Sequence, residues 1–154
     1  MELRIISGNV LTGTRINSAD GYLHFPYTQL TVIPEILQSD EFLGWASLSP
    51  KKLSLSPSYP GHWFRRYFTP DARLNGGRRT MIMSGQYDKV LPMDILPEYL
   101  IKAIQSRDIS SMEKLGIYEV APEDFALAEF VDSSKLPLQQ IIREGLDYLR
   151  KELE

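Results

Sequence analysis

The sequence predicts an α+β fold in which a β-rich part is followed by a small helical bundle. Residues 1–91 hold short apolar or alternating runs separated by turn residues, which favours an antiparallel sheet or partial barrel over βαβ units. From Pro92 onwards the apolar residues recur every three or four positions, as in amphipathic helices. We therefore expect two parts, residues 1–91 and 92–154.

The β-rich part offers several short candidate strands. Pro26 lies within one of them and marks it as an edge strand, because proline cannot donate to a ladder hydrogen bond. The run at 80–83 lies between Asn75-Gly76-Gly77 and Ser84-Gly85, which are turn sequences. The candidate strands are residues 3–6, 10–11, 21–27, 29–33, 42–46, 53–56 and 80–83.

The first helix is expected to begin between Pro92 and Pro97. Asp94 lies between these prolines and is a good N-cap, while proline is tolerated only where a helix does not need the N–H. Glu98 and Lys102 are spaced as an ion pair four residues apart on its outer face. This segment would form a rigid joint between the two parts.

Three further helices are expected toward the C-terminus. Ser110 and Glu113 form a capping-box pattern, and the helix that they start should end at Gly116, which suits the C′ position. Pro122 precedes a helix over 125–131, since proline and acidic residues favour a first turn. Pro137 opens the last helix, whose apolar stripe runs nearly to the terminus.

Composition excludes several classes of site. The 154 residues include no cysteine, so disulfides, thiolate zinc sites and cysteine-bound iron–sulfur clusters are excluded within this chain, and only two histidines are present. No apolar run approaches the ~20 residues that span a bilayer, and we expect neither a membrane span nor a signal peptide. The net charge of −3 gives no global attraction to nucleic acid.

No catalytic, cofactor-binding or metal-ligating residue is assigned from the sequence. The turn Gly76-Gly77-Arg78-Arg79 could hold a phosphate through backbone N–H groups and arginine charge, but it also fits a hairpin with a solvated basic end. It matches neither the dinucleotide-binding nor the Walker pattern.

A basic and aromatic stretch is the candidate docking surface. Between His62 and Arg79 five arginines accompany a single acidic residue, Asp71. Aromatic rings and arginines suit an interface with a protein partner or lipid head groups, because both bury large area and arginine pairs with carboxylates or phosphates. The alternative is that the rings are buried under a loop and the arginines are merely solvated. The candidate residues are Trp63, Arg65, Arg66, Tyr67, Arg73, Arg78 and Arg79.

Four segments together resemble one family. They are Arg4–Gly13, the Gly76-Gly77 turn with Arg79 and Met81, the block Tyr87–Pro97, and Glu123–Leu127. They look like the C-terminal part of the A subunit of the bacterial sodium-translocating NADH:quinone reductase, essentially end to end. The first segment also resembles the closing strand of β-grasp ligand-binding domains. The resemblance implies a fragment without the N-terminal and Rossmann-like parts of that subunit.

The resemblance implies a peripheral subunit on the cytoplasmic face of the bacterial inner membrane, in a complex that oxidises NADH, reduces ubiquinone and pumps sodium ions. The partners would be the other subunits of the complex, with ubiquinone possible through the full-length subunit, and no nucleic acid. NADH, flavins and iron–sulfur centres would belong to other subunits, so that this chain carries no cofactor and alone has no activity.

Related electron-transfer proteins carry a CxxCxxCxxxCP iron–sulfur motif in their helical region. By resemblance its four cysteines fall on Pro122, Phe125, Ala128 and Asp132, none of which supplies a thiolate. The helical part would then be a cluster-domain scaffold without the cluster. The rival hypothesis is a free-standing soluble module that binds a phosphate-bearing or sugar-like ligand near Gly76-Gly77-Arg78-Arg79.

Overall fold

The computed structural model describes residues 2–17, 21–35, 72 and 78–154. The chain divides into two compact units, Met1–Gly77 and Arg78–Glu154, and the predicted α+β class is confirmed. The boundary between the units lies between residues 77 and 78, whereas the change in the spacing of apolar residues predicts it between residues 91 and 92. The reason is that Tyr87 and Leu91 are buried in the apolar core of the helical unit.

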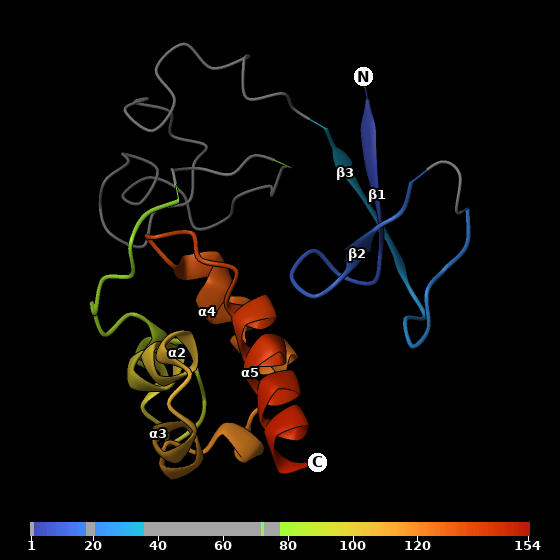
Figure 1. Cartoon of the computed structure of the whole chain (residues 1–154). Coiled ribbons are helices and arrows are strands. Elements are labelled where there is room, and N and C mark those ends of the chain that lie inside the picture. Colours follow the sequence, from blue (N-terminus) through green and yellow to red (C-terminus); the bar gives the residue numbers. More distant parts are fainter. Residues whose placement is uncertain (1, 18–20, 36–71, 73–77) are drawn as a thin grey trace. The chain divides into compact units, whose positions relative to one another are not determined.

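The first unit contains a small antiparallel sheet in the order β2-β1-β3 (Figure 1). Its strands are β1 (Leu3–Ser7), β2 (Thr14–Arg15) and β3 (Leu30–Pro34), so the candidate strands at 3–6 and 29–33 are confirmed. Arg4 on β1 donates from Nε and Nη2 to the two carboxylate oxygens of Glu35, at 2.8 and 2.7 Å. This hydrogen-bonded pairing with Arg4 lowers the pKa of Glu35. It joins the start of β1 to the residue after β3.

The predicted strand at residues 10–11 is wrong. The Asn9 side-chain oxygen accepts the backbone N–H groups of Leu11 and Thr12, each at 2.7 Å, and the Asn9 carbonyl accepts the N–H of Gly13 at 2.9 Å. An asparagine that bonds nearby backbone offers an alternative to the sheet ladder. The chain therefore turns here, and the second strand begins at Thr14.

The predicted edge strand at 21–27 is also wrong. The N–H of Tyr27 donates to the carbonyl of His24 at 3.0 Å, which closes a turn around Pro26, and the N–H of His24 donates to the Ser7 hydroxyl at 2.9 Å. Alternating apolar residues are present, but their backbone groups bond within the turn and to a side chain. The candidate strands at 42–46 and 53–56 lie outside the described residues.

The helices of the second unit are shown in Figure 1, and their buried side chains form one apolar cluster. The helices at 125–131 and after Pro137 are confirmed within one residue, and Gly116 adopts φ 82° just after α3, as expected at C′. The elements are η3 (Tyr87–Lys89), α2 (Pro97–Ser106), α3 (Ile109–Lys114), η4 (Ile117–Glu119), η5 (Pro122–Phe125), α4 (Ala126–Val131) and α5 (Leu138–Leu153).

Two helix starts differ from the prediction. Helix α2 begins at Pro97 with Leu96 at the N-cap position and no side-chain cap, and Asp94 is exposed before it, so the predicted Asp94 cap is wrong. Proline at N1 needs no N–H partner, which places the start at the second of the two prolines. Helix α3 begins at Ile109, because the Asp108 carboxylate caps the N–H of Ser111 at 3.2 Å.

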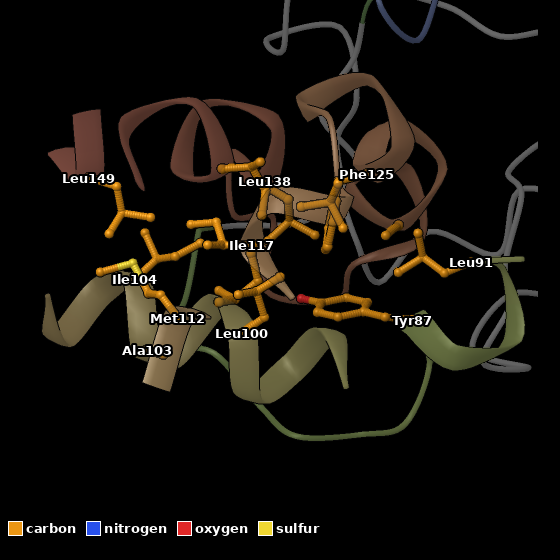
Figure 2. Packing of buried hydrophobic residues seen from close by; sticks show 14 residues of the cluster. Tyr87, Leu91, Leu100, Ala103, Ile104, Met112, Ile117, Phe125, Leu138 and Leu149 are labelled. Atoms are coloured by element: carbon orange, nitrogen blue, oxygen red, sulfur yellow. The ribbon is translucent and has the colours of Figure 1, made fainter. Parts of the chain in front are cut away.

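The core of this unit is formed by side chains from all of its helices (Figure 2). Leu100, Ile101, Met112, Ile117, Phe125 and Leu138 are fully buried there. Helices α2 and α5 approach closely at Gly145, where an added Cβ would lie 2.9 Å from Cγ2 of Ile104. In the described part of the chain no helix is long and apolar enough to cross a membrane.

Candidate functional site

The candidate docking surface is only partly described. Five of its seven residues, Trp63, Arg65, Arg66, Tyr67 and Arg73, lie outside the described residues, as does the Gly76-Gly77 turn. Arg78 and Arg79 are described, and both are exposed. The unit that begins with these two arginines contains ten basic and fourteen acidic residues. The arginines are therefore two adjacent positive charges in a unit with an excess of negative charge.

The backbone that follows the two arginines is anchored to the connection between α4 and α5. The N–H of Arg79 donates to the carbonyl of Ser134 at 2.9 Å, and the Ser134 hydroxyl donates to the carbonyl of Thr80 at 3.1 Å. Ser134 itself is fully buried. These bonds replace the strand predicted at 80–83, which is wrong, and they hold the backbone at Arg79 while its side chain stays in solvent.

Ser134 is in turn fixed by a buried carboxylate. Asp132 is 2% exposed, and its Oδ1 and Oδ2 accept the N–H groups of Ser134 and Leu136 at 3.0 and 2.8 Å. Between them Lys135 adopts a φ of 56°, and burial lowers the pKa of its ammonium group. A hydrogen-bonded chain thus runs from Asp132 through Ser134 to the backbone of Arg79.

A second buried carboxylate anchors the segment before η3. Glu98 is 7% exposed, and its Oε1 accepts the N–H groups of Ser84 and Gly85 at 2.9 and 2.7 Å. The predicted ion pair with Lys102 is wrong, since this carboxylate faces inward and Lys102 is exposed. Glu98 and Asp132 together attach the irregular segment 79–85 to the helices.

The negative charges of both anchoring carboxylates, Asp132 and Glu98, act on the hydroxyl of Tyr87. Its ring is 1% exposed, and Figure 2 shows its hydroxyl pointing inward among the core residues. No described group meets hydrogen-bond geometry with this hydroxyl, although the Asp132 carboxylate is close enough to act on it. Burial, followed by the negative charges of Asp132 and Glu98, raises the pKa of Tyr87.

The four positions that the resemblance assigns to cluster cysteines are packed into the protein. Pro122 is buried, Phe125 and Ala128 are fully buried in the apolar core, and Asp132 binds backbone N–H groups (Figure 2 shows Phe125). These side chains therefore stabilise the unit by packing and hydrogen bonding. The described residues contain no group of three or more histidine or acidic side chains arranged to hold a metal ion.

The anchoring roles of Glu98, Asp132 and Ser134 were not predicted from the sequence. Asp132 carries a signal for its own role, because an aspartate side chain commonly accepts the backbone N–H of the residue two positions on, in an Asx turn. No comparable signal exists for Glu98, because its partners lie 13 and 14 residues away.

Comparison with curated proteins confirms the resemblance. The chain is 36% identical over 151 residues to the A subunit of the Na(+)-translocating NADH-quinone reductase of Actinobacillus succinogenes, and 39% identical over 152 residues to that of Vibrio anguillarum. The same protein of Mannheimia succiniciproducens is 38% identical over 149 residues. These matches cover 97–98% of this chain but only 33–34% of the relatives, consistent with a C-terminal fragment. No family model matches the chain.

Proposed function

We propose that this chain, homologous along its length to about a third of the A subunit of the sodium-translocating NADH-quinone reductase, is a docking and scaffold element of that complex. The observation that carries the proposal is the identity of 36–39% over nearly the whole chain. The whole subunit would contribute to quinone reduction on the cytoplasmic face of the inner membrane. This portion would hold the subunit on its membrane partners.

Arg78 and Arg79 support the docking role. Their side chains are exposed, and the backbone at Arg79 is fixed through Ser134 and Asp132. A fixed backbone lowers the entropy that is lost when a side chain binds a partner. Arginine suits phosphates of lipid head groups and carboxylates of a protein partner equally well, because its planar guanidinium binds either in a bidentate manner.

The proposal assigns no redox cofactor to this chain. With no cysteine and no Gly-rich dinucleotide motif, the chain offers neither an iron–sulfur ligand set nor a nucleotide-binding loop. NADH, flavins and iron–sulfur centres would belong to other subunits. We expect the purified chain to be colourless after gel filtration, and bound flavin or iron would contradict this assignment.

Charge reversal tests the docking role. In the complex assembled with the whole subunit that contains this chain, Arg78→Glu with Arg79→Glu should reduce retention of this subunit by roughly tenfold in moderate salt, as expected for interface charges. The Arg65→Glu with Arg66→Glu pair should act in the same direction. For the Arg78 and Arg79 pair, the melting temperature of the isolated chain should stay nearly unchanged, because these two exposed charges contribute little to folding.

The matched control is Lys102→Glu with Lys114→Glu, which makes the same charge change at exposed positions on α2 and α3. Its retention should equal that of the unmodified subunit. Normal retention of both arginine pairs, or a large fall in the stability of the isolated chain, would contradict docking through this surface. Binding of phosphate-bearing ligands to the isolated chain, abolished by the Arg78 and Arg79 changes, would favour the rival ligand-binding module.

A further inference from the structure

Lys135 differs in its surroundings from every other lysine that the structure describes. It lies in the connection between α4 and α5 and is half-buried, whereas the others are exposed on helices. Lysine normally keeps its ammonium group in water and buries only its aliphatic stem. The exposed lysines are Lys89, Lys102, Lys114 and Lys151.

The backbone of Lys135 directs its side chain back toward α4. Its φ of 56° is in the left-handed region, which glycine adopts readily and residues with a Cβ disfavour. In this conformation the Lys135 Nζ atom donates to the carbonyl oxygen of Phe130, in the last turn of α4, at 3.5 Å. The amine is thus held at the end of a helix, where the helix dipole favours a positive charge.

No carboxylate pairs with this amine among the described residues. The two oxygens of Asp132 accept backbone N–H groups of the same connection, at 3.0 and 2.8 Å. Glu129 is similarly engaged, since its Oε2 accepts the N–H of Gln139 at 2.9 Å. The acceptor that the structure gives to the Lys135 amine is therefore a neutral carbonyl.

A half-buried amine without a counter-ion is more easily deprotonated than an exposed one. Burial disfavours the charged form and lowers the pKa of Lys135, and the negative charge of Asp132 opposes this only in part. The neutral amine is the nucleophilic form of lysine, and desolvation is one of the ways in which proteins activate it. At neutral pH a larger share of Lys135 than of the exposed lysines is therefore reactive.

We infer that Lys135 is a modification site that takes an acyl group from a small acyl phosphate, because its amine is half-buried at the end of α4 without a carboxylate partner. Half-burial favours a small donor over a bulky one. An anionic donor suits the surroundings, since the N–H of Arg79 donates to the carbonyl of Ser134, next to Lys135. The exposed Arg78 and Arg79 therefore add positive charge to this part of the surface, which raises the local concentration of anions.

The reaction is a simple acyl transfer. The lone pair of the neutral Nζ attacks the acyl carbonyl carbon, the C–O bond to phosphate breaks, and phosphate leaves with the electron pair while the nitrogen releases one proton to solvent. The product is an amide, so the positive charge of Lys135 is lost. If the arginines dock the subunit as proposed above, acylation would weaken that docking, whereas the reactivity of Lys135 does not depend on the docking role.

Competitive acylation of the isolated chain tests the inference. The chain is treated with acetyl phosphate at about pH 7.5, and the acetylation rate of each lysine is measured by site-resolved mass spectrometry. We expect Lys135 to react roughly threefold or more faster than the mean of the exposed lysines, because one pKa unit changes the neutral fraction about tenfold. A rate equal to or below that mean would overturn the inference.

The pH dependence separates deprotonation of the amine from other causes of fast reaction. At about pH 10 the exposed lysines approach their ordinary pKa and become neutral to a similar degree, so the excess of Lys135 should shrink. An excess that is the same at both pH values would show that the donor is bound beside Lys135 whatever its protonation state. That result would overturn the inference as stated.

A matched variant moves the amine by two residues. Lys135→Gly with Ser133→Lys places glycine at the left-handed position, where it fits, and the amine at an exposed position of the same connection. Acetylation at position 133 should then be no faster than at the exposed Lys102. Acetylation there as fast as at Lys135 in the unmodified chain would assign the reactivity to the neighbouring arginines, and would contradict a role for the half-buried setting.

Discussion

Glu98 contributes to stability as an acceptor for backbone N–H groups and not as a surface charge. Its Oε1 accepts from Ser84 and Gly85, so Glu98→Ala would leave two backbone donors without their partner. We expect this change to lower the free energy of unfolding by about 1–3 kcal/mol, at about 0.5–1.5 kcal/mol for each of the two hydrogen bonds lost. Glu98→Gln retains an acceptor oxygen and should lose much less.

The control for this prediction is Lys102→Ala. If Glu98 acted through the helix ion pair suggested by its spacing, the lysine variant would reproduce part of the loss. We expect Lys102→Ala to change stability by less than about 0.5 kcal/mol, as for surface substitutions in general. Denaturant unfolding of the three variants measures these differences, and similar losses for Glu98→Ala and Glu98→Gln would show that the acceptor oxygen is not what matters.

The raised pKa of Tyr87 predicts that the free energy of unfolding depends on pH in the alkaline range. Its folded-state pKa lies above the ordinary value of 10.0, so its neutral form is favoured by folding. The associated stability is fully present below pH 10 and is lost as the pH rises from there, because the unfolded chain releases the phenolic proton first. The free energy of unfolding of Tyr87→Phe should therefore fall less steeply than that of the unmodified protein above about pH 10.

At neutral pH the same substitution should be nearly neutral. The Tyr87 hydroxyl forms no hydrogen bond to a described group, and removal of an unpaired buried polar group costs little or is stabilising. Chemical denaturation at pH 7 and at alkaline pH gives both values. A loss of several kcal/mol at pH 7 would show that the hydroxyl is bonded and that its contact with Asp132 is strong.

At the scale of elements, Gly145 sets how closely α5 approaches α2. Alanine is favoured over glycine within a helix by about 1 kcal/mol, but its Cβ would lie 2.9 Å from Ile104 Cγ2. Overpacking of a core costs about 1–3 kcal/mol, so Gly145→Ala should be destabilising despite the gain in helix propensity. In a double-mutant cycle, Ile104→Ala should relieve the clash, so the two losses should add to more than the loss of the double variant. Strict additivity would mean that α5 shifts without strain.

The elements also show which sequence signals were sufficient. Proline before an apolar stripe correctly indicated α4 and α5, because the helix geometry and the buried face are encoded in the same short segment. The runs at 21–27 and 80–83 have strand-like composition, yet their backbone groups bond to a turn and to Ser134. Where the partner of a backbone group lies far along the chain, a local pattern cannot identify it.

The same reasoning applies to the candidate site. Exposure of Arg78 and Arg79 followed from their charge and the neighbouring glycines, whereas the anchor at Ser134 joins positions 54 residues apart. Lys102 lies one helical turn from Glu98, and this spacing predicts an exposed ion pair, whereas the Glu98 side chain is buried. Charge spacing on a helix predicts an ion pair only when the face is exposed.

At the scale of the whole molecule, the helical unit carries its own core. Every residue of its apolar cluster lies between Tyr87 and Leu149, and the anchors at Glu98 and Asp132 bind groups of the same unit. We expect residues 78–154 to fold alone, with a helical circular dichroism spectrum and one cooperative denaturant transition. A non-cooperative transition, restored to a cooperative one in the full chain, would show that the first unit completes the fold of the second.

The hydrogen bonds that the N–H groups of Ser84 and Gly85 donate to Glu98 also affect how fast these amide hydrogens exchange with solvent. These two amides belong to a segment without regular secondary structure, where amide hydrogens normally exchange with solvent rapidly. Because a buried carboxylate holds both of them, their exchange requires the segment to leave α2. Their exchange rates would thus report how often the anchored segment that begins at the arginine pair opens and closes.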